Sequence, residues 1–156
     1  TELLNRHYFY IRLSLALQMS KRDQNFGAVI FIDLNKFKKL NDQYGHNTGD
    51  AYLVEIANRM KTVVREKDCL ARIGGDEFVV LLEGLGRDEQ TAKHNAHRVA
   101  DKLQTAIEVK FILQDISYKG SASVGVTMFL GTQKTAEEIV AQADQHMYLI
   151  KHALKY

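Results

Sequence analysis

Residues 72–82 read Arg72-Ile73-Gly74-Gly75-Asp76-Glu77-Phe78-Val79-Val80-Leu81-Leu82, an apolar run preceded by two glycines and two adjacent carboxylates. The run at 79–82 predicts a buried strand, and residues 69–73 predict its hairpin partner. We expect the glycine pair to supply the positive φ angles of a tight turn. Asp76 and Glu77 would then lie at the tip of the hairpin, where they either shield the turn or hold a cation.

The composition indicates a single domain spanning residues 1–156. Hydrophobic residues make up 46% of the chain and charged residues 26%, both ordinary values for a globular domain of this size. The net charge of +2 argues against binding to nucleic acid or to a membrane surface. No apolar run reaches the length of a transmembrane helix.

Two features bear on the setting of the domain. Cys69 is the single cysteine, which excludes an internal disulfide and predicts a cytoplasmic location. The chain starts at Thr1 rather than at a methionine, so we expect a domain excised from a longer, multidomain signalling protein. That protein would carry a sensory or regulatory domain and could itself be membrane-anchored.

The spacing of apolar residues predicts the remaining elements. Helices are expected at residues 3–19, 36–40, 50–65 and 88–107, and after a capping box formed by Thr135 and Glu138. Strands are expected at residues 28–32, 109–113, 116–119 and 121–129, with Gly125 as a bulge. Polar residues predict a break at 20–25 and a loop at 41–50. This order predicts an α+β fold, with a ferredoxin-like, palm-type central sheet that is mostly antiparallel and flanked by helices.

Asp33 follows the strand expected at residues 28–32. If that strand neighbours the hairpin, Asp33 approaches Asp76 and Glu77. Three clustered carboxylates repel one another unless a cation or a proton joins them. Oxygen ligands of this kind suit Mg²⁺, which proteins usually share with substrate phosphates. Asp33 alone would be read as a cap for the next turn, but the adjacent Gly-Gly-Asp-Glu favours a metal site.

Further polar residues allow two interpretations each. The lysines at 36–39 either form a solvated face or reach a phosphate, and the same choice holds for Lys151 and Lys155 on the last expected helix. Asn41 and Asp50 could read a guanine edge, since their side chains offer the required acceptors and donors. They could equally serve as turn and capping residues.

Together these segments resemble the GGDEF domain of diguanylate cyclases over essentially the whole chain. Residues 74–78 are the full Gly-Gly-Asp-Glu-Phe signature, and residues 33–42 resemble the family's upstream Asp-x-Asp-x-Phe-Lys-x-x-Asn-Asp block. Residues 44–50 continue that block, while 123–126 and 143–151 resemble the C-terminal motifs. Several ordered blocks at family spacing make the resemblance specific.

The resemblance implies a reaction. Such domains join two GTP molecules into cyclic di-GMP and release two pyrophosphates, with the 3′-OH of one nucleotide attacking the α-phosphate of the other. Each domain binds one GTP, so the active form is an antiparallel homodimer. The implied cofactor is Mg²⁺, with Mn²⁺ as an alternative.

The resemblance also implies roles for individual residues. The implied metal ligands are Asp33, the Leu34 carbonyl and Asp76. The implied catalytic residues are Asp76, Glu77 and Lys38. The implied contacts to GTP are Asn41, His46, Asp50, Gly74, Gly75, Lys151 and Lys155. Asp76 is also the residue implied to accept the proton of the attacking hydroxyl.

Arg65 and Asp68 precede the glycine pair and resemble the family's inhibitory product site. Arg65 could grip guanine or phosphate, and Asp68 a guanine edge. Without the resemblance, the helix dipole would account for Arg65 near a helix end. The resemblance favours a site that binds cyclic di-GMP and slows the enzyme.

Three departures from the family pattern stand out. Asn35 replaces the second acid of the upstream block, and Leu154 and Lys155 replace a Gly-Arg pair. Residues 1–6 resemble only the end of the N-terminal motif, which we expect to weaken dimerisation. The alternative function is a catalytically silent module that binds GTP or cyclic di-GMP and regulates a neighbouring domain. The intact signature acids favour the active enzyme.

Overall fold

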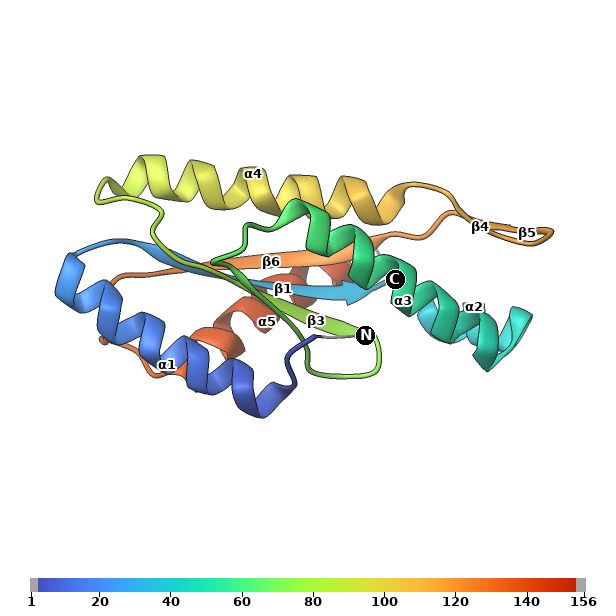
Figure 1. Ribbon diagram of the computed structural model, residues 1–156, viewed down its shortest axis with the longest axis horizontal. Helices are drawn as coiled ribbons and strands as arrows, with labels where there is room; N and C mark the ends of the chain where they lie inside the picture. Colours follow the sequence, from blue (N-terminus) through green and yellow to red (C-terminus); the bar gives the residue numbers. More distant parts are fainter. Residues whose placement is uncertain (1–2, 154–156) are drawn as a thin grey trace.

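The structure is a computed structural model that describes residues 3–153. In chain order its elements are α1 (Arg6–Asp23), β1 (Gly27–Leu34), α2 (Phe37–Tyr44), α3 (His46–Val63), β2 (Cys69–Arg72), β3 (Glu77–Leu82), α4 (Glu89–Glu108), β4 (Phe111–Leu113), β5 (Ile116–Tyr118), β6 (Ala122–Phe129) and α5 (Ala136–Ala153) (Figure 1). Each predicted helix and strand is present, with shifted ends.

The central sheet has the strand order β2-β3-β1-β6, and β4 and β5 form a separate hairpin. Every neighbouring pair in the sheet is antiparallel. Since β1 and β2 are both antiparallel to β3, they run parallel to each other, and the segment α2–α3 connects them. This is the split βαβ arrangement of a ferredoxin-like fold. The predicted α+β fold with an antiparallel sheet is confirmed.

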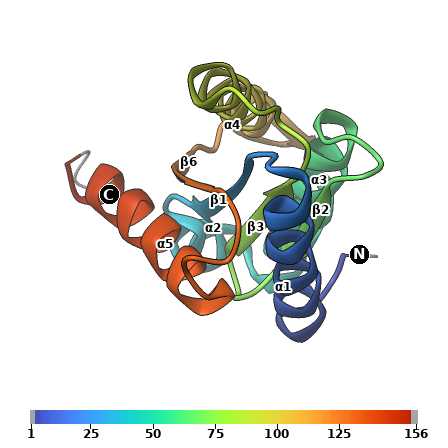
Figure 2. The ribbon, with the colours of Figure 1, turned by 90° about the vertical axis from the view of Figure 1, so that its left-hand side faces the viewer.

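Helices cover both faces of the sheet (Figure 2). On β1, Ile30 and Ile32 pack in the core beneath α3 and α4, whereas Val29 and Phe31 pack in the core beneath α1 and α5. Successive side chains of a strand point to opposite faces, so a strand buried on both sides reads as one continuous apolar run. By the same alternation, Asp33 belongs to the face covered by α1 and α5.

The glycine pair does not form the turn that its sequence predicts. Neither Gly74 nor Gly75 has a positive φ angle. The loop closes instead through the amides of Ile73 and Gly74, which donate to the Glu77 carbonyl oxygen at 3.0 and 3.4 Å. A Cβ at Gly74 would collide with the Glu77 side chain, whereas a Cβ at Gly75 would meet open space. Gly74 therefore leaves room for the Glu77 side chain rather than supplying a left-handed backbone.

The loop predicted at residues 41–50 is wrong. Helix α2 continues to Tyr44 and helix α3 begins at His46, so Gly45 with a φ of 92° is the only residue between them. The polar residues of this segment lie in the two helices, and most of them are exposed, while Thr48 is buried. The predicted break at residues 20–25 is also wrong in part, because α1 continues to Asp23.

Gly125 does not form a bulge. The register between β1 and β6 is continuous and pairs Phe31 with Gly125. A Cβ at this position would collide with the Ala143 carbonyl oxygen and the Met147 amide nitrogen of α5. The glycine therefore lets the backbone of α5 lie directly on the sheet.

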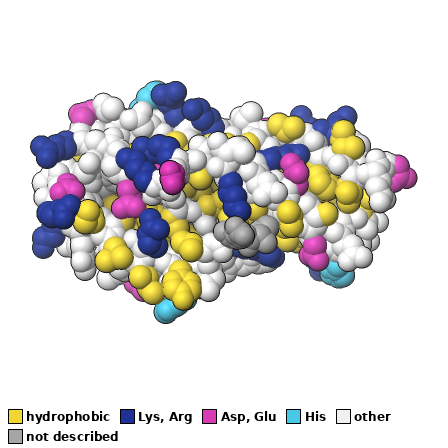
Figure 3. Space-filling view, in the orientation of Figure 1, with side chains coloured by type: hydrophobic (Ala, Val, Ile, Leu, Met, Phe, Trp, Pro, Cys, Tyr) yellow, Lys and Arg dark blue, Asp and Glu magenta, His cyan; other side chains and the backbone are white. Residues whose placement is uncertain are grey.

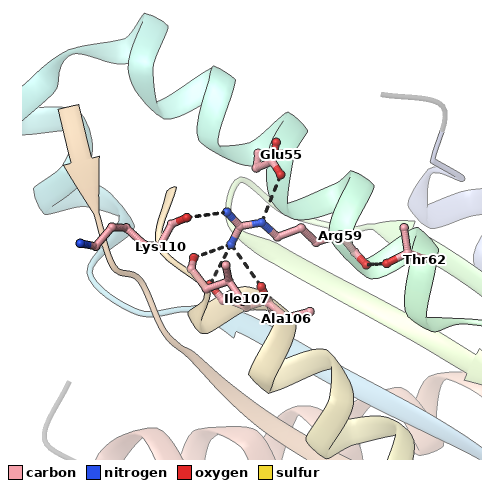
Figure 4. Close-up of polar contacts among 7 residues, drawn as sticks. Glu55, Arg59, Thr62, Ala106, Ile107 and Lys110 are labelled. Carbon is pink, nitrogen blue, oxygen red and sulfur yellow. Dashed lines mark hydrogen bonds and ion pairs between the residues drawn. The ribbon is translucent and has the colours of Figure 1, made fainter. Parts of the chain in front are cut away.

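Arg59 joins α3 to the end of α4 (Figure 4). Its guanidinium donates to the carbonyl oxygens of Ala106, Val109 and Lys110 at 3.1, 2.6 and 3.2 Å, and it pairs with Glu55. The last carbonyls of a helix lack partners within the helix. Arg59 supplies those partners and fixes the start of the β4–β5 hairpin.

The capping box predicted for α5 is confirmed. The Glu138 amide donates to Thr135 Oγ1, and the Thr135 amide donates to Glu138 Oε1, both at 3.1 Å. The pKa of Glu138 is lowered because its carboxylate accepts a hydrogen bond from the Thr135 amide, with a further contribution from the Thr135 side chain.

Helix α1 is apolar on two sides. Its inner side packs on the sheet, and apolar side chains also gather on its outer side (Figure 3). The exposed apolar residues of α1 are Tyr8, Ile11, Leu15 and Met19. Within residues 3–153, no helix has the length and apolar character needed to cross a bilayer.

Candidate functional site

The end of β1 and the start of β3 bring three carboxylates to one corner of the sheet. Asp33 is paired with Glu77 in the β1–β3 register. The Leu34 amide donates to the Asp76 carbonyl oxygen at 3.0 Å, which holds the loop of Asp76 against the end of β1. The proximity expected for Asp33, Asp76 and Glu77 is therefore present.

The Asp33 side chain is largely buried, and only one of its two carboxylate oxygens has a hydrogen-bond partner among the described residues. Its Oδ2 accepts a hydrogen bond from Lys151 Nζ at 2.9 Å. Its Oδ1 is buried and has no hydrogen-bond partner among the described residues. Burial raises the pKa of Asp33, and the nearby Asp76 carboxylate raises it further, although the hydrogen bond from Lys151 opposes both. The negative charge of the carboxylates at this corner therefore exceeds the single positive charge of Lys151.

This corner fits a divalent cation. The unpartnered Asp33 Oδ1 and the neighbouring Asp76 carboxylate are oxygen ligands of the type that Mg²⁺ and Mn²⁺ take. Among residues 3–153, no three His, Cys, Asp or Glu side chains are arranged to hold a metal ion by themselves. Two carboxylates are nevertheless the usual protein contribution when Mg²⁺ shares its remaining positions with substrate phosphates and water.

Glu77 lies beside a cavity on the face of the sheet that α1 and α5 cover. It lines a cavity of about 580 Å³ together with Arg6, Tyr10 and Asp144. Burial raises the pKa of Glu77, and the carboxylates of Asp33, Asp144 and Asp76 raise it further. Glu77 thus shares the electrostatic environment of the carboxylate corner while its side chain packs over the loop.

Arg72 is a site residue that the sequence did not reveal. Its Nε donates to the Gly74 carbonyl oxygen at 3.0 Å, and its Nη2 donates to the Gly75 carbonyl oxygen at 2.7 Å. The guanidinium therefore binds the backbone of the loop that carries Asp76. The only signal in the sequence is an arginine two positions before the glycine pair.

The residues expected around guanine lie on α2 and α3. Asn41 Oδ1 is buried without a hydrogen-bond partner among the described residues and lies against Gly49, where a Cβ would collide with it. This contact places Asn41 beside the turn of α3 that carries Asp50. His46 and Asp50 are exposed.

The expected phosphate contacts differ in their settings. Lys38 is exposed on α2, and no hydrogen bond or ion pair joins it to the carboxylates in the described part of the chain. Lys151 is held by Asp33 rather than pointing into solvent. Lys155 lies outside the described residues, as does Leu154.

Asn35, which departs from the family pattern, has a structural role. Its Nδ2 donates to Ser121 Oγ, and its Oδ1 accepts from Ser123 Oγ, both at 2.9 Å. Because both ends of the amide are occupied, Asn35 ties the end of β1 to β6. A carboxylate at this position could not donate to Ser121 Oγ, since it has no N–H donor, and could only accept from the two hydroxyls.

Arg65 and Asp68 form a pair at the opposite end of the β2–β3 hairpin. The Asp68 carboxylate, only 1% exposed, accepts from the Arg65 amide, Nε and Nη2 at 2.9, 3.1 and 3.0 Å. Arg65 Nη2 also donates to the Glu83 carbonyl oxygen at 2.9 Å. Asp68 therefore orients Arg65.

A basic cavity opens beside this pair. It has a volume of about 200 Å³ and is lined by Arg65 together with Arg98 and Lys102 of α4. The two α4 residues come more than 30 positions after Arg65 and carry no motif, so the sequence did not connect them with it. The cavity presents three cationic side chains to an anionic ligand.

Comparisons with known proteins agree on one family. A family model described as "Diguanylate cyclase, GGDEF domain" matches residues 1–155. The chain is 38% identical over 151 residues to the bifunctional diguanylate cyclase/cyclic di-GMP phosphodiesterase MucR of Pseudomonas aeruginosa, covering 97% of this chain and 21% of MucR. It is 38% identical over 152 residues to the diguanylate cyclase TpbB of the same organism, covering 97% of this chain and 34% of TpbB.

A solved structure supports the same relationship. The GGDEF domain of TpbB from Pseudomonas aeruginosa superposes with a TM-score of 0.90 at 36% sequence identity, covering 98% of this chain and 87% of that one. The chain thus spans nearly all of a separately solved domain, but only 21% and 34% of the length of the two curated relatives.

Proposed function

The chain belongs to the GGDEF domain family of diguanylate cyclases, and we propose that it joins two GTP molecules into cyclic di-GMP with release of two pyrophosphates. The observation that carries the proposal is the buried Asp33 Oδ1, which lacks a partner beside the Asp76 carboxylate. A buried anionic oxygen of this kind is costly unless a cation completes it.

The carboxylate corner would hold the metal. Mg²⁺, or Mn²⁺, would bind to Asp33, the Leu34 carbonyl oxygen and Asp76, and it would neutralise phosphate charge and lower the pKa of the attacking 3′-OH. Asp76 accepts the proton of that hydroxyl. Glu77 adds to the negative potential of the corner and holds its place in the loop through Gly74.

The nucleotide would lie between the corner and the α2–α3 segment. Asn41 and Asp50 read the guanine edge with His46 beside them, and Lys38 meets the charge that builds on the phosphates. Lys151 and Lys155 hold the terminal phosphates. Gly75, beside open space, lets the triphosphate approach the backbone.

Turnover requires two chains. Each domain presents one nucleotide, and the 3′-OH of each GTP must attack the α-phosphate of the other. We therefore include an antiparallel homodimer in the proposal, with cyclic di-GMP leaving after the second attack.

The test is a product assay. Purified protein with GTP and Mg²⁺ is expected to yield cyclic di-GMP and two equivalents of pyrophosphate, resolved by anion-exchange chromatography. Asp76→Ala should reduce the rate at least about 10³-fold, since it removes both a metal ligand and the proton acceptor. Asp101→Ala, which removes an exposed carboxylate from α4, is the matched control. Tight GTP binding without turnover would instead favour a silent binding module.

We also propose that Arg65 and the neighbouring basic cavity bind cyclic di-GMP as an inhibitor. Arg98 and Lys102 support this assignment, because they add two cations beside the oriented Arg65 guanidinium. Arg65→Ala is expected to raise the inhibitory concentration of cyclic di-GMP at least about tenfold with the initial rate preserved. Arg87→Ala, an exposed arginine outside this cavity, is the control. An unchanged inhibition curve for Arg65→Ala would refute the assignment.

A further inference from the structure

Lys151 binds one oxygen of the carboxylate whose other oxygen, the unpartnered Oδ1, is expected to hold the cation. It lies 118 residues from Asp33 in the sequence, yet its Nζ is 2.9 Å from Asp33 Oδ2. The side chains of Lys151 and Asp33 are only 24% and 14% exposed. The lysine assigned to the phosphates is therefore paired with the carboxylate assigned to the metal.

The two assignments compete for the same ammonium group. A divalent cation beside Asp33 would share the carboxylate's charge and repel the ammonium, which carries the same sign. The ammonium would then be free to find another anion. The nearest anions in the proposed complex are the phosphates of the bound nucleotide.

The change would be confined to the side chain. Helix α5 rests directly on the sheet at Gly125, where its Ala143 and Met147 backbone atoms leave no room for a Cβ. Lys151 lies one helical turn beyond Met147, so its Cα is held near the sheet. The flexible four-carbon stem of lysine can still carry the ammonium from one anion to another.

We propose that Lys151 is an exchangeable counter-ion, paired with Asp33 until a divalent cation binds and then transferred to the phosphates of the nucleotide. This inference rests on the proposed function, because it takes Asp33 and Asp76 as the metal site. It makes metal and nucleotide binding mutually dependent. Metal alone has to compete with Lys151 for the charge of Asp33, whereas metal with nucleotide gives Lys151 a new partner.

The test measures metal affinity without turnover. Mn²⁺ is titrated into nucleotide-free protein, and the free ion is counted by electron paramagnetic resonance. Lys151→Met should bind Mn²⁺ about tenfold more tightly than the wild type, because the competing ammonium is gone. Lys151→Arg should stay close to the wild type. Lys93→Met, which removes an exposed positive charge from α4, controls for net charge.

The opposite result is expected for the nucleotide. With Mn²⁺ saturating, 3′-deoxy-GTP, which lacks the attacking hydroxyl, should bind at least about tenfold more weakly to Lys151→Met than to the wild type. A residue with a merely structural role would weaken both ligands or neither. Lys151→Gln provides a second variant, and circular dichroism verifies that each variant is folded.

The outcomes separate this inference from the proposed function. If Lys151→Met binds Mn²⁺ no more tightly than the wild type, including no binding to either, the exchange is refuted. The exchange is also refuted if 3′-deoxy-GTP binds equally well to both proteins. Absence of cyclic di-GMP from the wild type, with the opposed affinity changes intact, would instead refute the catalytic proposal alone.

Discussion

At the scale of single residues, Arg72 connects the sheet to the loop of Asp76, the proposed catalytic carboxylate. Its guanidinium holds the carbonyl oxygens of Gly74 and Gly75, so its loss should loosen Asp76. We expect Arg72→Ala to lower kcat by about 10- to 100-fold, since displacements near 1 Å at a reacting group have costs of this size. Steady-state kinetics with GTP measure this change in kcat.

The control is Arg72→Lys, which retains one donor and should recover part of the rate. The KM for GTP should change together with kcat, because Arg72 holds Gly74 and Gly75, which are expected to contact the nucleotide. An unaltered kcat in Arg72→Ala would show that the loop keeps its geometry without the guanidinium.

Asp88 predicts a pH dependence of stability. As the N-cap of α4 it accepts hydrogen bonds from the Thr91 amide and Oγ1 at 2.9 and 2.6 Å, and these bonds lower its pKa. A lowered pKa in the folded state stabilises the protein above the ordinary carboxyl pKa. That contribution is lost as the pH falls through the lowered value.

Asp88→Asn should therefore make the unfolding free energy fall less steeply between about pH 5 and pH 3. Urea unfolding followed by circular dichroism at each pH measures the slope. The same substitution at Asp101, elsewhere on α4, is the control. Parallel slopes for wild type and Asp88→Asn would contradict the assigned role of the cap.

Sequence reasoning anticipated residues that follow regular strands and missed those that bind backbone. The proximity of Asp33 to Asp76 follows from a strand and a hairpin, both visible as apolar runs. Arg72 and Arg59 act on carbonyl oxygens, and every residue has a carbonyl, so no residue type marks their targets. Arg98 depends on a helix packed beside Arg65, which only the fold establishes.

At the scale of elements, α5 depends on Gly125 of β6. Because a Cβ there would meet backbone atoms of α5 rather than a flexible side chain, Gly125→Ala should reduce the unfolding free energy by about 1–3 kcal/mol. Urea denaturation measures the loss. Gly75→Ala is a matched control, since its Cβ meets open space. Equal stability of the two variants would mean that α5 moves away without cost.

The errors in element prediction have a common cause. The sequence predicts a bulge at Gly125, a turn at Gly74 and a loop at residues 41–50, whereas the two glycines allow close packing and residues 41–44 and 46–50 are helical. The type of a residue indicates its conformational freedom, but it does not indicate which atoms pack against that residue in the fold. Apolar patterns, by contrast, report burial directly: continuous runs predict β1 and β3, and alternation predicts β6.

At the scale of the whole molecule, catalysis should depend on chain concentration. Since two domains must meet to join two GTP molecules, the rate per chain should fall in proportion to dilution below the dimer dissociation constant. Initial rates over a range of enzyme concentrations with saturating GTP measure this. A dimerising coiled coil fused to the domain should remove the dependence. A constant rate per chain for the unfused domain would contradict the proposed dimer.

The β2–β3 hairpin keeps its two polar sites apart. Asp76 lies at its closed end, while Arg65 bonds to the carbonyl of Glu83 just past the end of β3. The six residues of β3 separate Asp76 from Glu83, a distance of about 20 Å along an extended chain. Cyclic di-GMP at Arg65 would not overlap with GTP at Asp76. Inhibition of this enzyme should therefore be noncompetitive: the product lowers the maximal rate, and no excess of GTP restores it.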